Sequence, residues 1–441
     1  MDKFIINGGV KLKGEVKVSG AKNVAMKVLL AGILTDKTIT IRNVPLISSV
    51  YGTAEIVKNL GVKVKINNDH TLIIKGNSIK NYMVPLELGG LYRTATMVMG
   101  PLVARFGKAV VPNPGGCRLG KRPIDRHIDG LRSMGVKIVQ KDGYFSAECP
   151  RLHGIKYKFK SNSHTGTETL LLAAVLAEGE TVLENAAEEP EVDDLIKLLN
   201  MMGAKICRKE NRKIIIKGVK KLEGAELTVM PDRNEVVTFA VAAIASGGDI
   251  IIDGTQRQYL KAFLEKLDQA NAFWEPISER KTRFYSKNKL QATDVVTRIY
   301  PGFMTDWQAP WAILMTQADG VSSIHETIFE DRFGYVSEIE KMGAKVSFYD
   351  PKISKPEKYY NFNWYDRKDN YHHAIKISGP TKLHNAVLNV TDLRAGATLV
   401  IGAIVAKGES IIHGVEHIDR GYEKLEERLR KLGANIRRVR L

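Results

Sequence analysis

Residues 167–186 read TETLLLAAVLAEGETVLENA, and this segment contains the unit from which the whole chain is built. Its first part is apolar almost all round at helical spacing, so a helix there must be buried on every side. Gly179 then allows a tight turn, and the residues after it are typical of a strand. The segment therefore predicts a buried helix that is followed directly by a strand.

The same combination of buried helix, glycine turn and strand recurs along the chain. Its six copies cover residues 21–44, 92–111, 167–183, 235–252, 308–324 and 395–412. Such units bury little surface alone, so they are expected to pack against their siblings.

A second recurring phrase lies between these copies and predicts the end of an amphipathic helix. Its clearest form is Met202-Gly203-Ala204-Lys205-Ile206, in which the glycine is a natural left-handed residue after a helix and the next residues begin a strand. The other copies lie at 60–64, 134–138, 342–346 and 432–436, with a degraded one at 267–273.

Together the two patterns predict an α/β protein with six repeats of about 70 residues. The length of 441 residues favours two domains. We expect three repeats in each, with buried helices in the middle and sheets outside. The first domain is placed at 22–230, and the second at 231–441 together with the N-terminal residues 1–21.

Composition is that of a globular protein, with 44% hydrophobic and 26% charged residues. The net charge of +17 suits acidic partners such as phosphorylated metabolites, nucleic acid or an anionic membrane. The basic residues are dispersed, so a nucleic-acid partner is not expected, and no apolar run is long enough for a membrane span. Three cysteines without metal or disulfide spacing, and no signal peptide, predict a cytoplasmic protein.

The loop at 111–125, VPNPGGCRLGKRPID, concentrates reactive and basic residues. Its prolines and glycines shape the backbone, and Arg118, Lys121 and Arg122 follow Cys117. A thiol among cations is expected to be an acid or a nucleophile. The alternative, a surface turn with an incidental cysteine, stays open on composition alone.

Polar residues begin each of the six buried helices, so the helix starts are candidate anion sites. Asp232 and Asp392 are good capping residues, and either Thr305 or Asp306 can cap the fifth helix. Arg332 and Arg420 can equally be surface residues.

Other classes of site have little support in the sequence. The ten histidines have no metal-ligand spacing, and there is neither a Walker A loop nor a dinucleotide-binding glycine motif. No metal and no cofactor is therefore expected. Residues 359–373, YYNFNWYDRKDNYHH, interrupt the repeat and are interpreted as an exposed hairpin insertion, with a ligand lid or partner contact as the alternative.

Eight motifs, spread from the first repeat to the last, resemble those of the UDP-N-acetylglucosamine enolpyruvyl transferases, within the enolpyruvyl transferase family. They are SGAKN at 19–23, GPLVARFG at 100–107, PGGCRLGKRPID at 114–125, LAEGETVLENAAEEPEV at 176–192, FMTDWQAPW at 303–311, ETIFEDRF at 326–333, TDLRAGATLV at 391–400 and HIDRGYE at 417–423. The resemblance implies two inside-out α/β domains, each made of three βαβαββ repeats.

The resemblance also implies transfer of the enolpyruvyl group of phosphoenolpyruvate to the 3′-hydroxyl of UDP-N-acetylglucosamine, with release of phosphate. Asp306 matches the family's base, Lys22 and Cys117 match catalytic residues, and the cysteine is the one that fosfomycin attacks. Substrate-binding positions are matched by Asn23, Arg93, Arg122, Arg394, Arg420, Arg332, Asp392, Ser163 and Thr165.

Parts of the nucleotide-sugar side depart from the family pattern. The third helix usually starts SVGAT, whereas residues 163–167 read SHTGT, and residues 232–238 also differ. An enolpyruvyl transferase for a different nucleotide or sugar acceptor is therefore an alternative. A non-catalytic paralogue that binds anions or nucleic acid is a further one, although the presence of Lys22, Cys117, Asp306 and Arg394 argues against it. The oligomeric state is left open.

Overall fold

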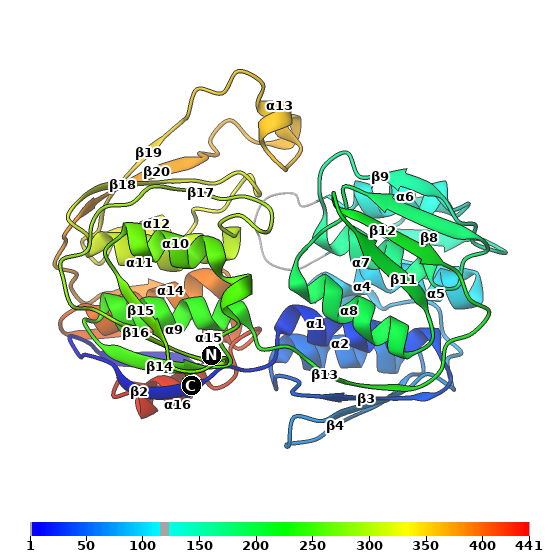
Figure 1. Cartoon of the computed structure of the whole chain (residues 1–441), viewed down its shortest axis with the longest axis horizontal. Helices are drawn as coiled ribbons and strands as arrows, with labels where there is room; N and C mark the ends of the chain where they lie inside the picture. The colour runs from blue at the N-terminus through cyan, green and yellow to red at the C-terminus, as the bar shows by residue number, and fades with distance from the viewer. Residues whose placement is uncertain (1, 115–122, 441) are drawn as a thin grey trace. The chain divides into compact units, whose positions relative to one another are not determined.

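A computed structural model describes residues 2–114 and 123–440. Contacts divide these residues into two compact units. The first unit comprises residues 20–114 and 123–230, and the second comprises residues 2–19 and 231–440. In each unit, sheets form the outside and the apolar helices lie within (Figure 1).

The first unit has three sheets around its helices. In spatial order, their strands are β13 (Ala225–Thr228), β3 (Thr38–Arg42), β5 (Leu72–Lys75) and β4 (Lys63–Ile66); β6 (Lys108–Pro112), β8 (Tyr144–Glu148) and β7 (Lys137–Lys141); and β11 (Lys205–Lys209), β12 (Lys213–Lys217), β10 (Glu180–Glu184) and β9 (Lys156–Lys158). The helices are α1 (Lys22–Ala31), with the 3₁₀ turn η1 (Gly32–Leu34), α2 (Ser48–Asn59), α3 (Leu86–Leu91), α4 (Thr94–Met97), α5 (Met99–Phe106), α6 (Asp125–Ser133), α7 (His164–Ala174) and α8 (Pro190–Met201).

The second unit repeats this plan. Its sheets contain β21 (Val387–Asn389), β22 (Glu409–His413), β1 (Lys3–Asn7) and β23 (Asn435–Val439); β15 (Phe273–Pro276), β16 (Lys281–Tyr285), β14 (Asp249–Asp253) and β2 (Lys13–Lys17); and β17 (Val295–Val296), β18 (Gly320–His325), β20 (Ala374–Gly379) and β19 (Lys345–Tyr349). The helices are α9 (Arg233–Ala245), η2 (Arg257–Tyr259), α10 (Lys261–Gln269), η3 (Thr305–Trp307), α11 (Gln308–Thr316), α12 (Val336–Glu340), α13 (Pro356–Tyr359), η4 (Trp364–Asp366), α14 (Leu393–Val405), α15 (Val415–Ile418) and α16 (Leu425–Lys431).

The predicted α/β architecture of buried helices and outer sheets is confirmed. Within the second unit, α9, α11 and α14 contact one another, and every residue of α9 is buried. In the first unit, α7 contacts both α1 and α5. A helix that is apolar all round has no solvated face, so it must lie among other elements.

The recurring phrase ends six helices with one backbone geometry. Its glycines have φ between 89° and 103°, and in the degraded copy Asn271 takes the left-handed position with φ of 56°. In each copy the residue after this position donates its N–H to the carbonyl five residues earlier, as Ala204 does to Leu199. This is the hydrogen bond of a Schellman motif, so the repeated glycine is explained by backbone conformation.

The N-terminal strand completes the last sheet of the second unit. In the other repeats, the strand after the buried helix has an antiparallel neighbour from its own repeat, as β3 has β5. The last repeat contains only β23 after β22, and β1 lies antiparallel between the two. Residue Ile5 faces Ile411 on one side and Arg437 on the other. The chain therefore needs its N-terminal residues to fill the sixth repeat.

The interpretation of residues 359–373 as an exposed insertion is wrong for part of the segment, although residues 368–370 are exposed. Tyr360, Phe362 and His373 are buried, and their rings pack together with Trp364. The phenol of Tyr360 also lies 3.0 Å from Nε2 of His325, at the end of β18. These aromatic residues bury one another without helical or strand periodicity, so the sequence pattern did not reveal the cluster.

Candidate functional site

In the second unit, Asp306 lies between two buried arginines. Its Oδ1 accepts a hydrogen bond from Nη2 of Arg332 at 3.2 Å, and its Oδ2 accepts one from Nε of Arg394 at 3.3 Å. Asp306 lies in η3, immediately before α11, whereas Arg394 lies in the first turn of α14. The side chain of Asp306 retains 29% exposure, while those of both arginines are almost fully buried. The carboxylate is therefore oriented by two buried arginines and remains partly exposed.

The guanidinium of Arg394 has a second polar partner, the phenol of Tyr422. Its Nη1 donates to Tyr422 Oη at 3.0 Å, and Tyr422 Oη lies 2.7 Å from Oγ1 of Thr238 on α9. Burial alone would lower the pKa of Arg394, but Tyr422 and the nearby carboxylates of Asp306 and Asp232 raise it overall. A permanent cation is thus fixed among three helix starts, which suits it to an anionic ligand.

Two of the predicted caps are present. Asp232 accepts hydrogen bonds from the N–H groups of Asn234 and Glu235, and Asp392 accepts them from Arg394 and Ala395. For Asp232 this agrees with a structural role.

Asp392 has an additional contact, because its Oδ1 lies 3.5 Å from Nη1 of Arg332. The surface interpretation of Arg332 is wrong, since the residue is buried. Arg420 follows α15 and lies two residues before Tyr422 in the chain.

The side chain of Glu326 stabilises the turn at Thr305 and Asp306. The carboxylate of this buried residue accepts hydrogen bonds from Thr305 Oγ1 at 2.8 Å and from the N–H of Ile328 at 2.7 Å. Burial raises the pKa of Glu326, although these hydrogen bonds and Arg332 oppose the shift. The side chain of Thr305 is therefore hydrogen-bonded to Glu326, whereas that of Asp306 is paired with Arg332 and Arg394.

In the first unit, the sequence-predicted residues also lie at helix starts. Lys22 and Asn23 begin α1, and Arg93 precedes α4, where its Nη2 donates to the carbonyl of Pro123 at 3.2 Å. Ser163 caps α7 by accepting a hydrogen bond from the N–H of Gly166 at 3.1 Å. These residues form a second group of polar side chains at the ends of buried helices.

Thr165, one residue into α7, contacts the buried imidazole of His127 on α6. Its Oγ1 lies 3.0 Å from Nε2 of His127. Burial lowers the pKa of His127 to about 3, and the positive charges of Arg93 and Arg126 contribute to the shift. His127 is therefore neutral at physiological pH, and the start of α7 lies close to two arginines.

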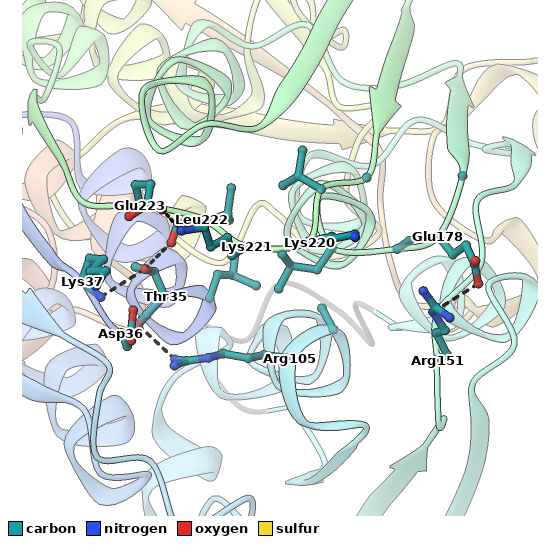
Figure 2. A pocket seen from close by; sticks show the side chains of 17 residues that line it. Thr35, Asp36, Lys37, Arg105, Arg151, Glu178, Lys220, Lys221, Leu222 and Glu223 are labelled. Atoms are coloured by element: carbon teal, nitrogen blue, oxygen red, sulfur yellow. Dashed lines mark hydrogen bonds and ion pairs between the residues drawn. The ribbon is translucent and has the colours of Figure 1, made fainter.

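The opposite ends of the helices in the first unit border a cavity of about 760 Å³ (Figure 2). Here Arg105 donates to the carbonyls of Ile33, Thr35 and Gly76, which lie near the end of α1. At the rim, Arg151 pairs with Glu178 at 3.2 Å and Lys221 pairs with Glu223 at 2.8 Å. Because helix C-termini carry partial negative charge and Arg105, Arg151 and Lys221 have partners, this cavity suits an anion less well than the helix starts do.

The structure thus brings Asp306, Arg332, Asp392 and Arg394 together in one unit and places Lys22, Asn23, Arg93, Ser163 and Thr165 at helix starts of the other. Cys117 and Arg122 lie outside the described residues. Sequence reasoning missed Tyr422, Thr238, Glu326 and His127. Of these, two lie in quoted motifs that could have pointed to them, Glu326 in ETIFEDRF and Tyr422 in HIDRGYE.

Among residues 2–114 and 123–440, no three His, Cys, Asp or Glu side chains are arranged to hold a metal ion. None of the helices described there combines the length and the apolar character needed to cross a membrane.

Comparison with known proteins identifies relatives along the whole chain. Residues 6–429 match the family model described as EPSP synthase (3-phosphoshikimate 1-carboxyvinyltransferase). A UDP-N-acetylglucosamine 1-carboxyvinyltransferase of Magnetococcus marinus is 41% identical over 439 residues, which is 100% of both chains. The enzyme of the same name from Acidobacterium capsulatum is 41% identical over 442 residues, covering 100% of this chain and 96% of that one.

Two solved structures share the fold. The enolpyruvyl transferase NikO from Streptomyces tendae has a TM-score of 0.86 at 23% identity and covers 99% of both chains. The EPSP synthase of Acinetobacter baumannii has a TM-score of 0.73 at 20% identity and covers 100% of both chains. At these identities, the likeness shows the fold alone.

Proposed function

The chain belongs to the EPSP synthase family of enolpyruvyl transferases, and we propose that it is a UDP-N-acetylglucosamine 1-carboxyvinyltransferase. In this reaction the enolpyruvyl group of phosphoenolpyruvate passes to the 3′-hydroxyl of UDP-N-acetylglucosamine, and phosphate is released. The product is a peptidoglycan precursor, and this is the first committed step of its synthesis. Full-length relatives at 41% identity with this name support the assignment.

The placement of Asp306 is the structural observation that best supports this chemistry. The acceptor hydroxyl must lose its proton as its oxygen attacks C2 of phosphoenolpyruvate, while C3 gains a proton. A tetrahedral ketal results, which loses phosphate and a C3 proton to give the enolpyruvyl ether. Asp306 is a partly exposed carboxylate whose orientation is fixed by Arg332 and Arg394, so it is suited to accept the hydroxyl proton.

The cations of the site are assigned to the anionic groups of phosphoenolpyruvate. Arg394 is fixed between Asp306 and Tyr422 before any ligand binds, so little reorganisation is needed when charge develops. Arg420, Lys22 and Arg122 are assigned to the same task by their motifs. Cys117 of the loop is assigned a different role, as an acid or in product release. Binding of the acceptor is assigned to Asn23, Ser163 and Thr165.

A phosphate-release assay tests the proposal. Purified protein is given phosphoenolpyruvate together with UDP-N-acetylglucosamine, other nucleotide sugars, free nucleotides or shikimate 3-phosphate. Release that depends on UDP-N-acetylglucosamine, with the enolpyruvyl ether seen by mass spectrometry, supports the proposed function. Release with a different acceptor alone would identify an enolpyruvyl transferase of another specificity, for which the sequence SHTGT at 163–167 provides a reason. No release with any acceptor would contradict the assignment.

A further inference from the structure

Two buried charged side chains and one half-buried histidine lie in contact in the first unit. Nζ of Lys27 on α1 lies 3.0 Å from Oε2 of Glu168 on α7, and Oε1 of Glu168 lies 3.2 Å from Nε2 of His164. Lys27 and Glu168 are essentially inaccessible to solvent, while the side chain of His164 is 23% exposed. We call these three residues the Lys27 cluster.

Burial of these charges is costly, so their presence needs an explanation other than stability. A buried ion pair gains little over apolar side chains of similar size, because desolvation offsets the attraction. Burial would raise the pKa of Glu168, but His164 and Lys27 lower it overall. Burial likewise would lower the pKa of His164, but Glu168 and Glu189 raise it. The charged forms are therefore maintained by one another.

The Lys27 cluster joins the starts of two helices that hold candidate substrate-binding residues. Lys27 Nζ also donates to the carbonyl of Asn23, one turn earlier in α1, at 2.9 Å. His164 and Glu168 belong to the first turns of α7, next to the cap Ser163 and to Thr165. A displacement of α7 relative to α1 would separate the buried charges of Lys27 and Glu168, which is costly inside a protein.

We propose that the Lys27 cluster is a positioning element that fixes the first turn of α7 against the first turn of α1 and thereby sets the affinity for the nucleotide-sugar acceptor. This inference rests on the proposed function for its ligand. It adds Lys27, His164 and Glu168 as positioning residues that do not themselves enter the chemistry. His164 and Thr165 stand where the family pattern has valine and glycine, so this helix start departs from that pattern.

The sharpest variant removes all three polar groups at once. In Lys27→Met/Glu168→Leu/His164→Val, apolar side chains of similar size replace the cluster, and such replacement is commonly neutral or stabilising for the fold. We expect the variant to melt close to wild type, yet its KM for UDP-N-acetylglucosamine should rise about tenfold with kcat within about threefold, because small misplacements of binding groups are costly. The KM for phosphoenolpyruvate is expected to stay within about twofold.

The matched control is Arg105→Met in the same unit. Arg105 joins α5 to backbone carbonyls near the far end of α1, so the control removes a structural cation without touching the helix starts (Figure 2). It is expected to lower the melting temperature and to leave both KM values unchanged. A rise in the acceptor KM of this control equal to that of the triple variant would overturn the inference.

Amide hydrogen exchange provides a readout that does not depend on activity. The N–H groups of Gly166 and Thr167 are bonded to Ser163 in the first turn of α7, and we expect them to exchange faster in the triple variant. Faster exchange with a raised acceptor KM supports the inference. Unchanged exchange, or faster exchange with an unchanged KM, overturns it. If the wild-type protein does not turn over UDP-N-acetylglucosamine, the proposed function fails, and exchange alone decides whether the cluster fixes α7.

Discussion

The two units place charge differently at the starts of their buried helices. In the second unit, Asp306 is partly exposed and its arginine partners approach from the interior. In the first unit, Lys27 and Glu168 are fully enclosed one turn into their helices. The same repeat therefore holds a partly exposed carboxylate between arginines in one unit and a fully enclosed ion pair between two helices in the other.

Because of this difference, substitutions in the two units are expected to affect different properties. An exposed carboxylate with buried partners should affect chemistry more than folding. A buried ion pair should affect folding when one partner is removed, because the other is left without compensation. Each of the four predictions that follow tests one side of this contrast.

Asp306→Asn is expected to have the largest effect. The amide keeps the size of the side chain but cannot take a proton from the acceptor hydroxyl, so kcat should fall about 10³-fold, within the range for a lost general base. Phosphate release under saturating substrates measures it, and thermal unfolding should change little.

The exposed Asp319 provides a matched control in the same unit, and Asp319→Asn should behave as wild type. A kcat for Asp306→Asn within tenfold of wild type would contradict the assignment of Asp306 as the base. A large loss of stability in Asp306→Asn would mean that the second unit, like the first, depends on this charged group for folding.

Lys27→Met alone is expected to destabilise the protein by about 3 kcal/mol, because Glu168 would stay buried without the cation 3.0 Å away. Urea unfolding monitored by circular dichroism measures the change. Adding Glu168→Leu and His164→Val should restore most of the lost stability. A loss below about 1 kcal/mol for the single variant would show that Glu168 is protonated or hydrated in its place, and the contrast between the units would then fail.

Arg394→Lys is expected to lower kcat/KM about 100-fold. The guanidinium of Arg394 contacts Asp306 through Nε and Tyr422 through Nη1, and a lysine ammonium cannot span both partners. Steady-state kinetics with both substrates measures the loss. Arg437→Lys, at an exposed position of β23, is the control and should be silent. A loss below about fivefold at Arg394 would remove it from the anion site.

The repeats could be predicted from sequence because they depend on local physics. The residue after each amphipathic helix has a positive φ, which favours glycine. Glycine accordingly occurs at five of the six positions. The sixth, Asn271, shows why the degraded copy was still recognisable, since asparagine tolerates the left-handed region better than most residues. The all-apolar helices likewise have one structural solution, which is burial.

The ionic partners of the site could not be predicted in the same way. Asp306 and Arg394 are separated by 88 residues, and only the fold brings them to 3.3 Å. Lys27 lies on an all-round apolar helix, and no local pattern announces Glu168 as its partner. The aromatic cluster around Tyr360 was also missed, because its rings satisfy one another without periodicity. The motifs identified candidate site residues, whereas the side chains that hold these residues in place could be found only in the structure.

The smallest predicted effect is a pH dependence of stability that comes from His164. The carboxylates of Glu168 and Glu189 raise its pKa in the folded protein against the opposing effects of burial and Lys27. The folded state therefore holds this proton more tightly than the unfolded state, where the pKa is about 6.5.

The resulting stabilisation is complete below pH 6.5 and is lost as the pH rises through the higher folded-state pKa. We expect the free energy of unfolding of wild type, relative to that of His164→Val, to decrease between pH 6 and pH 9. His384→Gln, which changes an exposed histidine of the second unit, should retain the wild-type slope. Parallel curves for wild type and His164→Val would show that the imidazole is neutral beside Glu168, and the buried charge of the first unit would then belong to Lys27 and Glu168 alone.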